Sequence, residues 1–484
     1  MLILVTSVAG VVFLVSLPYW LPQAVLCLRV LIFTRINGEE GMPIPGPRVD
    51  ASRFKQVYSH PAANGRSRGA ALSDLFWYWL SPGPEIHQEH IEPGEKYEEV
   101  ARTTRRILSI SRKAAQEMAT RCLAGVVQEL DIRDTRLVRL RDLMMPVWAD
   151  FYCELVFGQR ASPEARRLVV GNANDVVTAL KCCGLRHMEK RHRLTGFLIA
   201  KINGGEIPHR LPEHLSTEER ALYLQGAFFN TAVVQMSEAM VHLLMVVAQH
   251  PEIQARLASN PDDDLYLDQV IDETLRLYPL FGISHRITSA EIALDEQTVI
   301  PRGTVICFNH PEFQRVGFDR PESFDPSRWD GISHGEANYI PFGVSANRPC
   351  PAQGLAPLTM RAAAREMLSH FALYSSASHT RSVPNRGPCI LERREGKDNP
   401  RSRAALLAWM RVRDRWEDCW RSVVQLVLGT YMVWDARRLR LCERYFEAQG
   451  SGKETPNVAS QPVLPDQCPH AFGREKRSKE IGSP

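Results

Sequence analysis

The sequence predicts an α+β fold that is mainly α-helical, with a helical body and a small β-rich side. Segments before Pro279 have helical texture, and residues 221–248 are apolar on almost every side. A helix that is hydrophobic all round belongs in the middle of a large protein. After Pro279 the texture changes to short strand-like segments, with a turn at residues 301–303. With 484 residues, of which 44% are hydrophobic, the chain can bury a large core.

The N-terminus predicts a membrane anchor over residues 1–34. No charged residue occurs before Arg29, and roughly 20 apolar residues suffice to cross a bilayer as a helix. A cleavable signal peptide would carry a positive charge ahead of its apolar stretch, so the anchor is favoured. Arg29 and Arg35 follow the stretch, and the positive-inside rule puts that side in the cytosol. The alternative is an N-terminal helix packed on the protein.

The remaining elements follow in order along the chain. A proline-rich segment at residues 43–47 is a stiff, extended connector. Ser216 is the expected N-cap of the central helix, because serine accepts a bond from the first free N–H groups. The predicted helices cover residues 97–124, 146–157, 163–184, 216–249, 253–258, 263–278 and 355–370, and the predicted strands 286–288, 291–294, 298–300 and 304–308.

Beyond residue 395 the chain carries an extension. Residues 404–449 are helical in texture and rich in Trp, Arg and Leu, and the apolar part at 423–434 is too short to span a membrane. It is expected to be an amphipathic interfacial helix or a cap on the body. Residues 451–484 lack periodicity and are expected to be disordered. The predicted domains are therefore 1–34, 35–395, 396–450 and 451–484.

Charge and cysteine usage narrow the function classes. The net charge of +4 is mild and implies no nucleic-acid partner. The 11 cysteines are scattered and form no Cys-x-x-Cys pair. This pattern is typical of reduced, mostly buried thiols in a cytosolic compartment, rather than of a disulfide framework or a zinc site.

Cys350 is the most informative residue. It lies between two prolines, which lack the N–H and fix φ, so it belongs on a rigid loop. Arg348 supplies a fixed positive charge, and the predicted helix at 355–370 places the sulfur near a helix N-terminus, which favours a thiolate. A thiolate on such a loop is what a haem iron needs as its axial ligand in oxygen chemistry.

Residues 341–352 resemble the haem-binding loop of cytochromes P450. Residues 273–276 are similar to the family's Glu-x-x-Arg helix, and residues 326–329 to its Pro-Glu-Arg-Phe-type segment, in the family's order. The resemblance implies a cytochrome P450 fold over residues 35–395 that binds haem b (iron protoporphyrin IX) through Cys350. It also implies a structural ionic triad, and Glu273, Arg276 and Arg328 are its members.

The resemblance implies further contacts to the haem. Arg348 and Arg286 match positions at which family arginines pair with a haem propionate, and a guanidinium suits a carboxylate geometrically. Arg286 is equally compatible with an exposed strand arginine. Arg105 is a third expected contact, although Ala101 stands where the family usually has tryptophan. Phe342 is the expected aromatic wall beside the cofactor.

The haem loop departs from the family pattern. Phe342 precedes Cys350 by eight residues where the family has seven, so one residue is inserted. Ala346 and Ala352 occupy two positions that are glycine in the family. Ligation by Cys350 is still expected, while altered hydrogen bonding at the sulfur would change the redox potential.

The central helix departs more strongly. Monooxygenase members carry an acid followed by threonine above the iron for proton delivery. Here the pair falls on Val234 and Gln235. Gln235 can orient a water, and Thr231 or Ser237 can replace the threonine, so Gln235 and Thr231 are the candidate catalytic residues. The plain alternative is a different water network, and Glu238 is expected to face elsewhere.

The resemblance implies a membrane-anchored haem-thiolate monooxygenase. It would insert one oxygen atom from O2 into a lipophilic small molecule, in secondary metabolism, with electrons from an NADPH-dependent reductase on the same membrane. The family's microsomal members imply a single-pass protein of the endoplasmic reticulum with a cytosolic catalytic domain.

Two other functions stay open. The missing acid and the altered loop favour an isomerase, dehydratase or peroxygenase of the same fold that does not activate O2 through an acid–threonine pair. The extension from residue 396 favours a non-catalytic haem-binding or scaffold protein.

Overall fold

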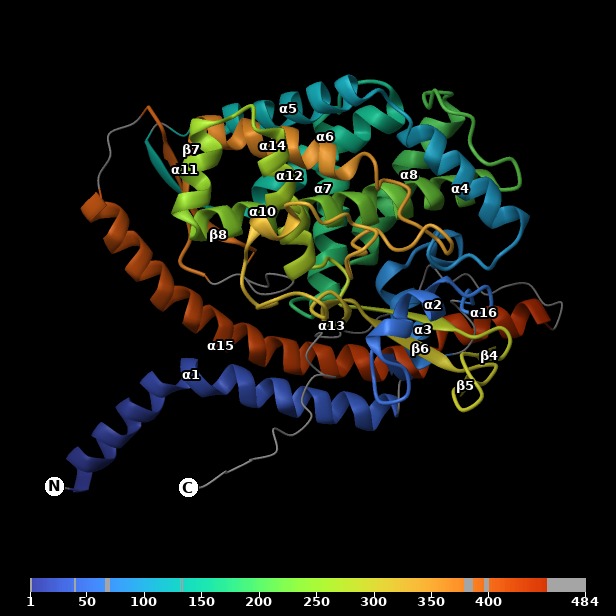
Figure 1. Cartoon of the computed structure of the whole chain (residues 1–484), viewed down its shortest axis with the longest axis horizontal. Helices are drawn as coiled ribbons and strands as arrows, with labels where there is room; N and C mark the ends of the chain where they lie inside the picture. Colours follow the sequence, from blue (N-terminus) through green and yellow to red (C-terminus); the bar gives the residue numbers. More distant parts are fainter. Residues whose placement is uncertain are drawn as a thin grey trace.

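Helices make up most of the computed structural model, which describes residues 2–38, 41–65, 70–130, 132, 134–377, 386–395 and 400–450. Figure 1 shows a helical body with the strands toward one side and two long helices beneath it. The predicted fold class is confirmed. The helices are α1 (Leu2–Asn37), α2 (Phe54–Ser59), α3 (Ala71–Leu80), α4 (Glu95–Leu108), α5 (Arg112–Glu129), α6 (Leu140–Phe157), α7 (Pro163–Leu180), α8 (Met188–Asn203), α9 (Thr217–Leu224), α10 (Val233–Gln249), α11 (Pro251–Ser259), α12 (Asp264–Leu277), α13 (His310–Phe313), α14 (Ala356–His370), α15 (Pro400–Leu439) and α16 (Leu441–Gly450).

The strands form small sheets at the edges of the body. In one sheet β6 (Val305–Asn309) lies between β1 (Met42–Ile44), which is parallel to it, and β3 (Ile283–Ile287), which is antiparallel. The proline-rich connector therefore begins as an edge strand. A second sheet has the order β2 (Thr135–Arg139), β8 (Pro388–Arg393), β7 (Phe371–Tyr374), and β4 (Ile292–Ala293) pairs with β5 (Val299–Ile300).

One predicted helix is two helices in the structure. The sequence predicts a single helix over 97–124, whereas α4 ends at Leu108 and α5 begins at Arg112. Ser111 adopts an extended conformation and accepts a hydrogen bond from the N–H of Ala114 at 3.2 Å, so it is an N-cap. The cap starts a new helix in a new direction, which an apolar pattern alone does not reveal.

The central helix runs through the body as predicted. Ser216 caps it in a reciprocal capping box with Glu219, which confirms the expected N-cap. α9 continues into α10 through a π-helical segment, Gln225–Ala232. α10 packs against α6, α12 and α14, and its side chains from Met236 to Ala248 are buried. π-helical turns often mark functional sites, because they shift side chains out of the regular α-helical register.

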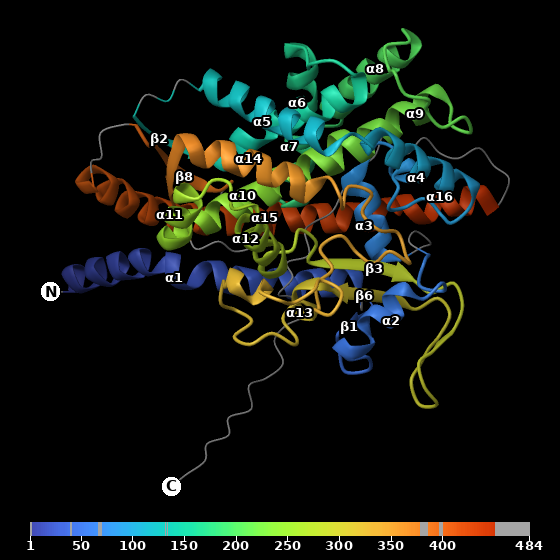
Figure 2. The same ribbon diagram turned by 45° about the horizontal axis from the view of Figure 1, so that its top comes forward.

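The N-terminal helix lies along the long helix of the C-terminal extension. α1 and α15 pack side by side, below the body in the view of Figure 1, whereas in Figure 2 α15 passes behind the body. The Tyr19 hydroxyl accepts a hydrogen bond from Arg415 at 2.9 Å, and a Cβ added at Gly429 would come within 3.1 Å of the Phe33 ring. The two helices therefore run parallel with a constant register over this stretch. The C-terminal half of α1 is packed on the protein, as the alternative prediction has it, while its N-terminal half stays the candidate anchor.

By length and composition, Thr6–Asn37 and Thr217–Gln249 could cross a membrane. In the first of them the most apolar 18-residue window is only 6% buried, whereas the corresponding window of the second is 78% buried. The second is therefore the core helix of the body, and α1 is the candidate span.

The extension after residue 395 is tied to the body. Met432, Val433 and Leu439 of α15 share a buried cluster with Trp77 and Trp79 of α3. The Asp74 carboxylate accepts hydrogen bonds from the N–H groups of Cys442 and Glu443 at 2.8 and 3.2 Å, and so caps α16. The extension is thus the predicted cap on the body. The tail predicted over residues 451–484 lies outside the described residues.

Candidate functional site

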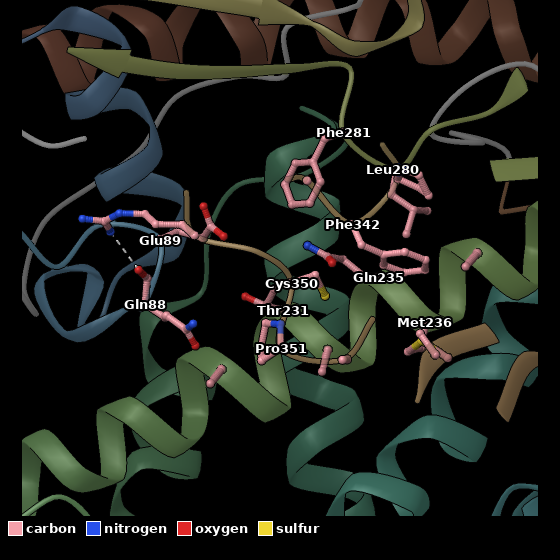
Figure 3. Close-up of a pocket in the computed structure, with 18 of the residues that line it drawn as sticks. Gln88, Glu89, Thr231, Gln235, Met236, Leu280, Phe281, Phe342, Cys350 and Pro351 are labelled. Atoms are coloured by element: carbon pink, nitrogen blue, oxygen red, sulfur yellow. Dashed lines mark hydrogen bonds between the residues drawn. The ribbon is translucent and has the colours of Figure 1, made fainter. Parts of the chain in front are cut away.

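The Cys350 loop and the central helix face each other across a cavity of about 160 Å³. Cys350 and Phe342 line one wall, and Thr231 and Gln235 line the other (Figure 3). The Cys350 sulfur points into this space. The structure thus brings together four of the residues that the sequence singled out, although more than 100 positions separate the loop from the helix.

Backbone bonds close the Cys350 loop into a fixed shape. The N–H of Cys350 donates to the carbonyl of Phe342 at 2.9 Å, and the N–H of Asn347 donates to the carbonyl of Val344 at 3.1 Å. The tight turn between Val344 and Asn347 accommodates the residue that is inserted in this loop. Gly343 has a φ of +73°, and an added Cβ would come within 3.3 Å of the Tyr58 hydroxyl, so glycine is required there.

Arg348 lines the cavity and has a buried donor without a partner among the described residues. Its Nε donates to Asn64 Oδ1 at 2.8 Å and Nη1 to the Gln88 carbonyl at 3.1 Å, while the guanidinium lies 4.5 Å from the centre of the Tyr97 ring. Nη2 is buried and has no hydrogen-bond partner among the described residues. Burial lowers the pKa of Arg348, and a buried, unsatisfied donor of this kind costs free energy until an acceptor meets it.

This set of donors fits a haem. A partly buried thiol that is free of disulfides could provide a sulfur ligand, and the Arg348 guanidinium of the same cavity could pair with a carboxylate. Arg348 adopts a φ of 50°, which costs a non-glycine residue about 1–2 kcal/mol. The two hydrogen bonds and the ring contact of its side chain hold it in this conformation.

Neither Arg286 nor Arg105 lines the cavity, so their contacts to a haem stay predictions. Arg286 is fully buried and donates to the carbonyls of Tyr58 and Asn347 at 2.8 and 3.3 Å, so it supports the Cys350 loop from behind. Arg105 is exposed on α4. Thr104 turns into the cavity from the neighbouring position, and successive residues of a helix point about 100° apart.

Glu273, Arg276 and Arg328 meet in a buried ionic cluster. Arg276 donates from Nε and Nη2 to the two Glu273 oxygens, both at 2.8 Å, and Arg328 Nε donates to Glu273 Oε1 at 3.1 Å. The N–H of Asp325 donates to the same oxygen at 3.1 Å. Two cations and an amide therefore satisfy a carboxylate whose side chain is fully buried. The cluster fastens residues 325–328 to α12 outside the cavity lining.

His87 is a cavity residue that the sequence did not indicate. Its Nε2 lies 2.6 Å from Thr231 Oγ1, and its Nδ1 accepts the N–H of Glu89 at 3.2 Å. Because Nδ1 is an acceptor, the proton of the neutral ring is on Nε2, which donates to Thr231. An added Cβ at Gly226 would lie 3.1 Å from the ring, so glycine on the central helix leaves space for it.

The side chains around Thr231 are only partly those that the sequence indicated. The Ser237 hydroxyl donates to the Val233 carbonyl at 2.6 Å and does not line the cavity, which removes it as the alternative to Thr231. The described carboxylate that lines the cavity is Glu89, from the loop before α4. No periodic pattern marks residues 84–91 in the sequence, so only the fold reveals that this segment lines the cavity.

A second cavity of about 220 Å³ adjoins the first and shares His87, Thr231 and Gln235 with it. Glu238, Lys181 and His242 line its far end. The Glu238 carboxylate accepts from Lys181 Nζ at 2.5 Å and from Arg141 Nε. Glu238 therefore faces away from the sulfur, as the sequence analysis expected.

The charges at this end have defined states at neutral pH. Burial opposes ionisation of Glu238, but Arg141 and Lys181 outweigh it and lower its pKa to about 2. Burial also lowers the pKa of His242 to about 4, although Glu238 opposes that shift. At pH 7 Glu238 is ionised and His242 is neutral, so Glu238 is not a proton donor.

Comparisons with known proteins agree with this geometry. The cytochrome P450 family model matches residues 188–393. Cytochrome P450 3A13 of Mus musculus is 28% identical over 211 residues, which are 38% of this chain and 41% of that protein. Ent-kaurenoic acid oxidase 2 of Arabidopsis thaliana is 31% identical over 137 residues, which are 28% of this chain and 26% of that protein.

The fold extends the similarity beyond the matched segment. A solved zebrafish cytochrome P450 with abiraterone has a TM-score of 0.59 at 16% identity, and the match covers 71% of this chain and 92% of that one. The chain spans only 41% of the length of the mouse relative, and the segment that matches the family model contains the Cys350 loop. The matched segment, the fold and that loop together support membership of the cytochrome P450 superfamily.

Proposed function

We propose that this protein is a haem-thiolate monooxygenase that inserts one oxygen atom from O2 into a lipophilic small molecule. The observation that carries the proposal is that Cys350 and Arg348 line the same cavity, and that the Arg348 side chain has a buried Nη2 donor without a partner among the described residues. Cys350 would bind the iron of haem b, and Arg348 would bind a propionate. Haem with a thiolate ligand supplies the activation of dioxygen.

The lining supports a lipophilic substrate. Leu108, Phe228, Met236, Leu280 and Phe281 contribute apolar side chains to the cavity that contains Cys350. Apolar walls with a few polar groups are typical of small-molecule sites, in which the polar groups orient the ligand. Thr231, Gln235 and His87 are such groups here, and they lie where the two cavities meet. A role in secondary metabolism is part of the proposal.

The proton-handling role falls to Thr231 and His87 in this proposal. The His87 Nε2–H donates to Thr231 Oγ1, which leaves the Thr231 hydroxyl hydrogen to be donated into the cavity. Gln235 can hold a water beside them by its amide. This arrangement replaces the acid–threonine pair, because the central helix offers Val234 and Gln235 at that place.

One observation favours a second function. The π-helical segment and its continuation carry no carboxylate at the position before Gln235, which suits an isomerase, dehydratase or peroxygenase that receives its oxygen in another form. The two functions differ in their need for electrons. Only the monooxygenase needs a reductase.

The partner and location follow from the monooxygenase proposal. The electron donor would be an NADPH-dependent reductase on the same membrane, with the endoplasmic reticulum as the location. Arg102, Arg105 and Arg106 are exposed on α4 and offer a basic surface to an acidic partner. Extraction of cell membranes with alkaline carbonate tests the location, because a single-pass anchor keeps the protein in the pellet.

The first experiment is the absorption spectrum of the reduced full-length protein under carbon monoxide. The wild type should show a strongly red-shifted Soret band, and Cys350→Ala should lose it. Cys183→Ala is the matched control, since that thiol is also partly buried but does not line the cavity. A wild type without haem, or a Cys350→Ala variant with the shifted band, would overturn the proposal.

The second experiment separates the two functions. Reaction under ¹⁸O2 with NADPH and a reductase should yield a product with one labelled oxygen atom per molecule. Product that forms at the same rate without reductase, or with oxygen drawn from peroxide alone, would favour the second function.

A further inference from the structure

α15 exposes a row of large apolar and aromatic side chains. The row, called the Trp stripe here, consists of Trp409, Val412, Trp416, Trp420, Val427, Tyr431 and Trp434, whose exposed fractions run from 43% to 69%. These positions recur at intervals of three, four or seven residues, so they share one face of the helix. The stripe is about 37 Å long at the usual rise per residue. Solvent-exposed apolar surfaces of this extent mark interaction sites.

The stripe lies opposite the side of α15 that packs on the molecule. Met410, Met432 and Ala436 are buried. Each of them stands about half a turn away from a stripe residue, at 3.6 residues per turn. The helix therefore buries one apolar side against α3 and α1 and presents a second apolar side outward. Packing within the described chain uses only the first.

The neighbour of α15 indicates what covers the stripe. α1 lies along α15, and its residues 8 and 11–15 are apolar and more than half exposed. Pro18 and Pro22 lie within α1, where the packed portion begins, since burial recurs from there at Val25 and Arg29. An apolar helix that leaves the body beside the stripe brings a lipid surface close to it.

The charges on α15 favour an anionic lipid surface. The helix carries eight arginines and four acidic residues. Arg413 lies over the Trp409 ring at 5.1 Å and Arg438 over the Trp434 ring at 5.6 Å, so a guanidinium accompanies the stripe at both ends. Tryptophan and arginine together suit the lipid headgroup region, where the indole ring is partly hydrated and the guanidinium pairs with a lipid phosphate. A second copy of the chain would instead bring two basic helices together.

We propose that α15 is an in-plane membrane-binding helix, with the Trp stripe buried at the boundary between headgroups and acyl chains of an anionic bilayer. The inference rests on the proposed membrane anchoring through α1. It adds that the same side of the body always faces the membrane. One apolar side of α15 is packed on the body and the other is the Trp stripe, so α15 cannot rotate without exposing one of them.

Hydroxyl-radical footprinting of the haem-loaded full chain tests the proposal residue by residue. The protein is labelled in detergent micelles, in phosphatidylcholine vesicles, and in vesicles that also contain phosphatidylserine. Trp420 labelling in the vesicles with phosphatidylserine should be at least about fivefold lower than in detergent micelles, since burial at the bilayer surface withdraws the ring from water. Leu265 on α12 is the internal control, with an exposed fraction of 71% against 69% for Trp420.

Two variants complete the design. Replacement of Trp416, Trp420 and Tyr431 by serine should leave membrane attachment through α1 intact but raise labelling at Trp409 and Trp434 in vesicles. Replacement of Leu265, Val316 and Ile332 by serine is the matched control, because these are exposed apolar residues of the body. The carbon monoxide spectrum should persist in both variants, so failure here is distinguishable from failure of the proposed function.

Equal Trp420 labelling with and without vesicles would overturn the proposal. So would protection of Trp420 in vesicle-free solution together with a doubled mass, which would assign the stripe to a second copy of the chain.

Discussion

Replacement of Glu238 by glutamine should destabilise the body strongly while leaving the haem site intact. The Glu238 side chain is 8% exposed, and its cationic partners Arg141 and Lys181 are 3% and 5% exposed. Removal of the carboxylate leaves two buried cations with their principal counter-charge gone. Loss of one partner of a buried ion pair costs about 3–5 kcal/mol, and two affected cations put this variant at about 5 kcal/mol.

The assay is urea unfolding of the full-length protein at pH 7.5, followed by tryptophan fluorescence. The midpoint should fall while the slope with denaturant stays the same, since the area exposed on unfolding is unchanged. Glu189→Gln is the control, because its partner Arg193 and Glu189 itself are 58% and 85% exposed. That change should stay within about 0.5 kcal/mol.

A second substitution sharpens the result. Lys181→Gln in the Glu238→Gln background should recover part of the lost stability, because it removes one of the uncompensated buried cations. The carbon monoxide spectrum should be unaltered, since Glu238 lines the second cavity and not the one with Cys350. A loss below about 1 kcal/mol for Glu238→Gln would refute the reasoning, because it would mean that water solvates these charges.

Three further predictions concern other parts of the chain. The pKa of His242 is lowered from 6.5 to about 4 in the folded state, so the stability it contributes should be full above pH 6.5 and fall by about 3 kcal/mol toward pH 4 as the unfolded state takes up the proton. Urea midpoints at pH 7.5 and 5 should differ in the wild type and much less in His242→Asn. Glu238 adds no pH dependence above its unfolded pKa of 4.5, because it is ionised there in both the folded and the unfolded state. Ser216→Ala removes the capping box of the central helix and should cost about 1 kcal/mol in the same assay, with no change expected in the slope. His87→Phe removes the donor to Thr231 and should lower the amount of product formed per NADPH by at least about tenfold. The carbon monoxide spectrum should be retained. An unchanged amount of product per NADPH would mean that His87 is not on the proton path.

Local patterns in the sequence determined much of the architecture. Ser216 followed by Glu219 marks a helix start because the capping box lies within one helical turn. The apolar surface of residues 221–248 marks a buried helix, and the prolines beside Cys350 mark a rigid loop. Each of these signals depends on neighbours a few positions away, so a linear pattern contains it. The family motifs added the order in which distant segments meet.

Tertiary structure alone decided which side chains share a space. The bond from His87 to Thr231 joins residues 144 positions apart, and the contact between Arg415 and Tyr19 joins residues 396 apart. The direction of Arg105 followed from the rotation of α4, which turns Thr104 toward the cavity instead.

The physical reason is the range over which each property is set. Caps, turns and apolar faces arise from backbone geometry within a few residues, and the chain carries them wherever it folds. The protonation state of Glu238, the unused donor of Arg348 and the outward side of α15 depend on which distant elements pack nearby. The sequence by itself therefore determined the rigid Cys350 loop and the helical body, and packing decided which residues are proposed to handle protons and which surface is proposed to face the membrane.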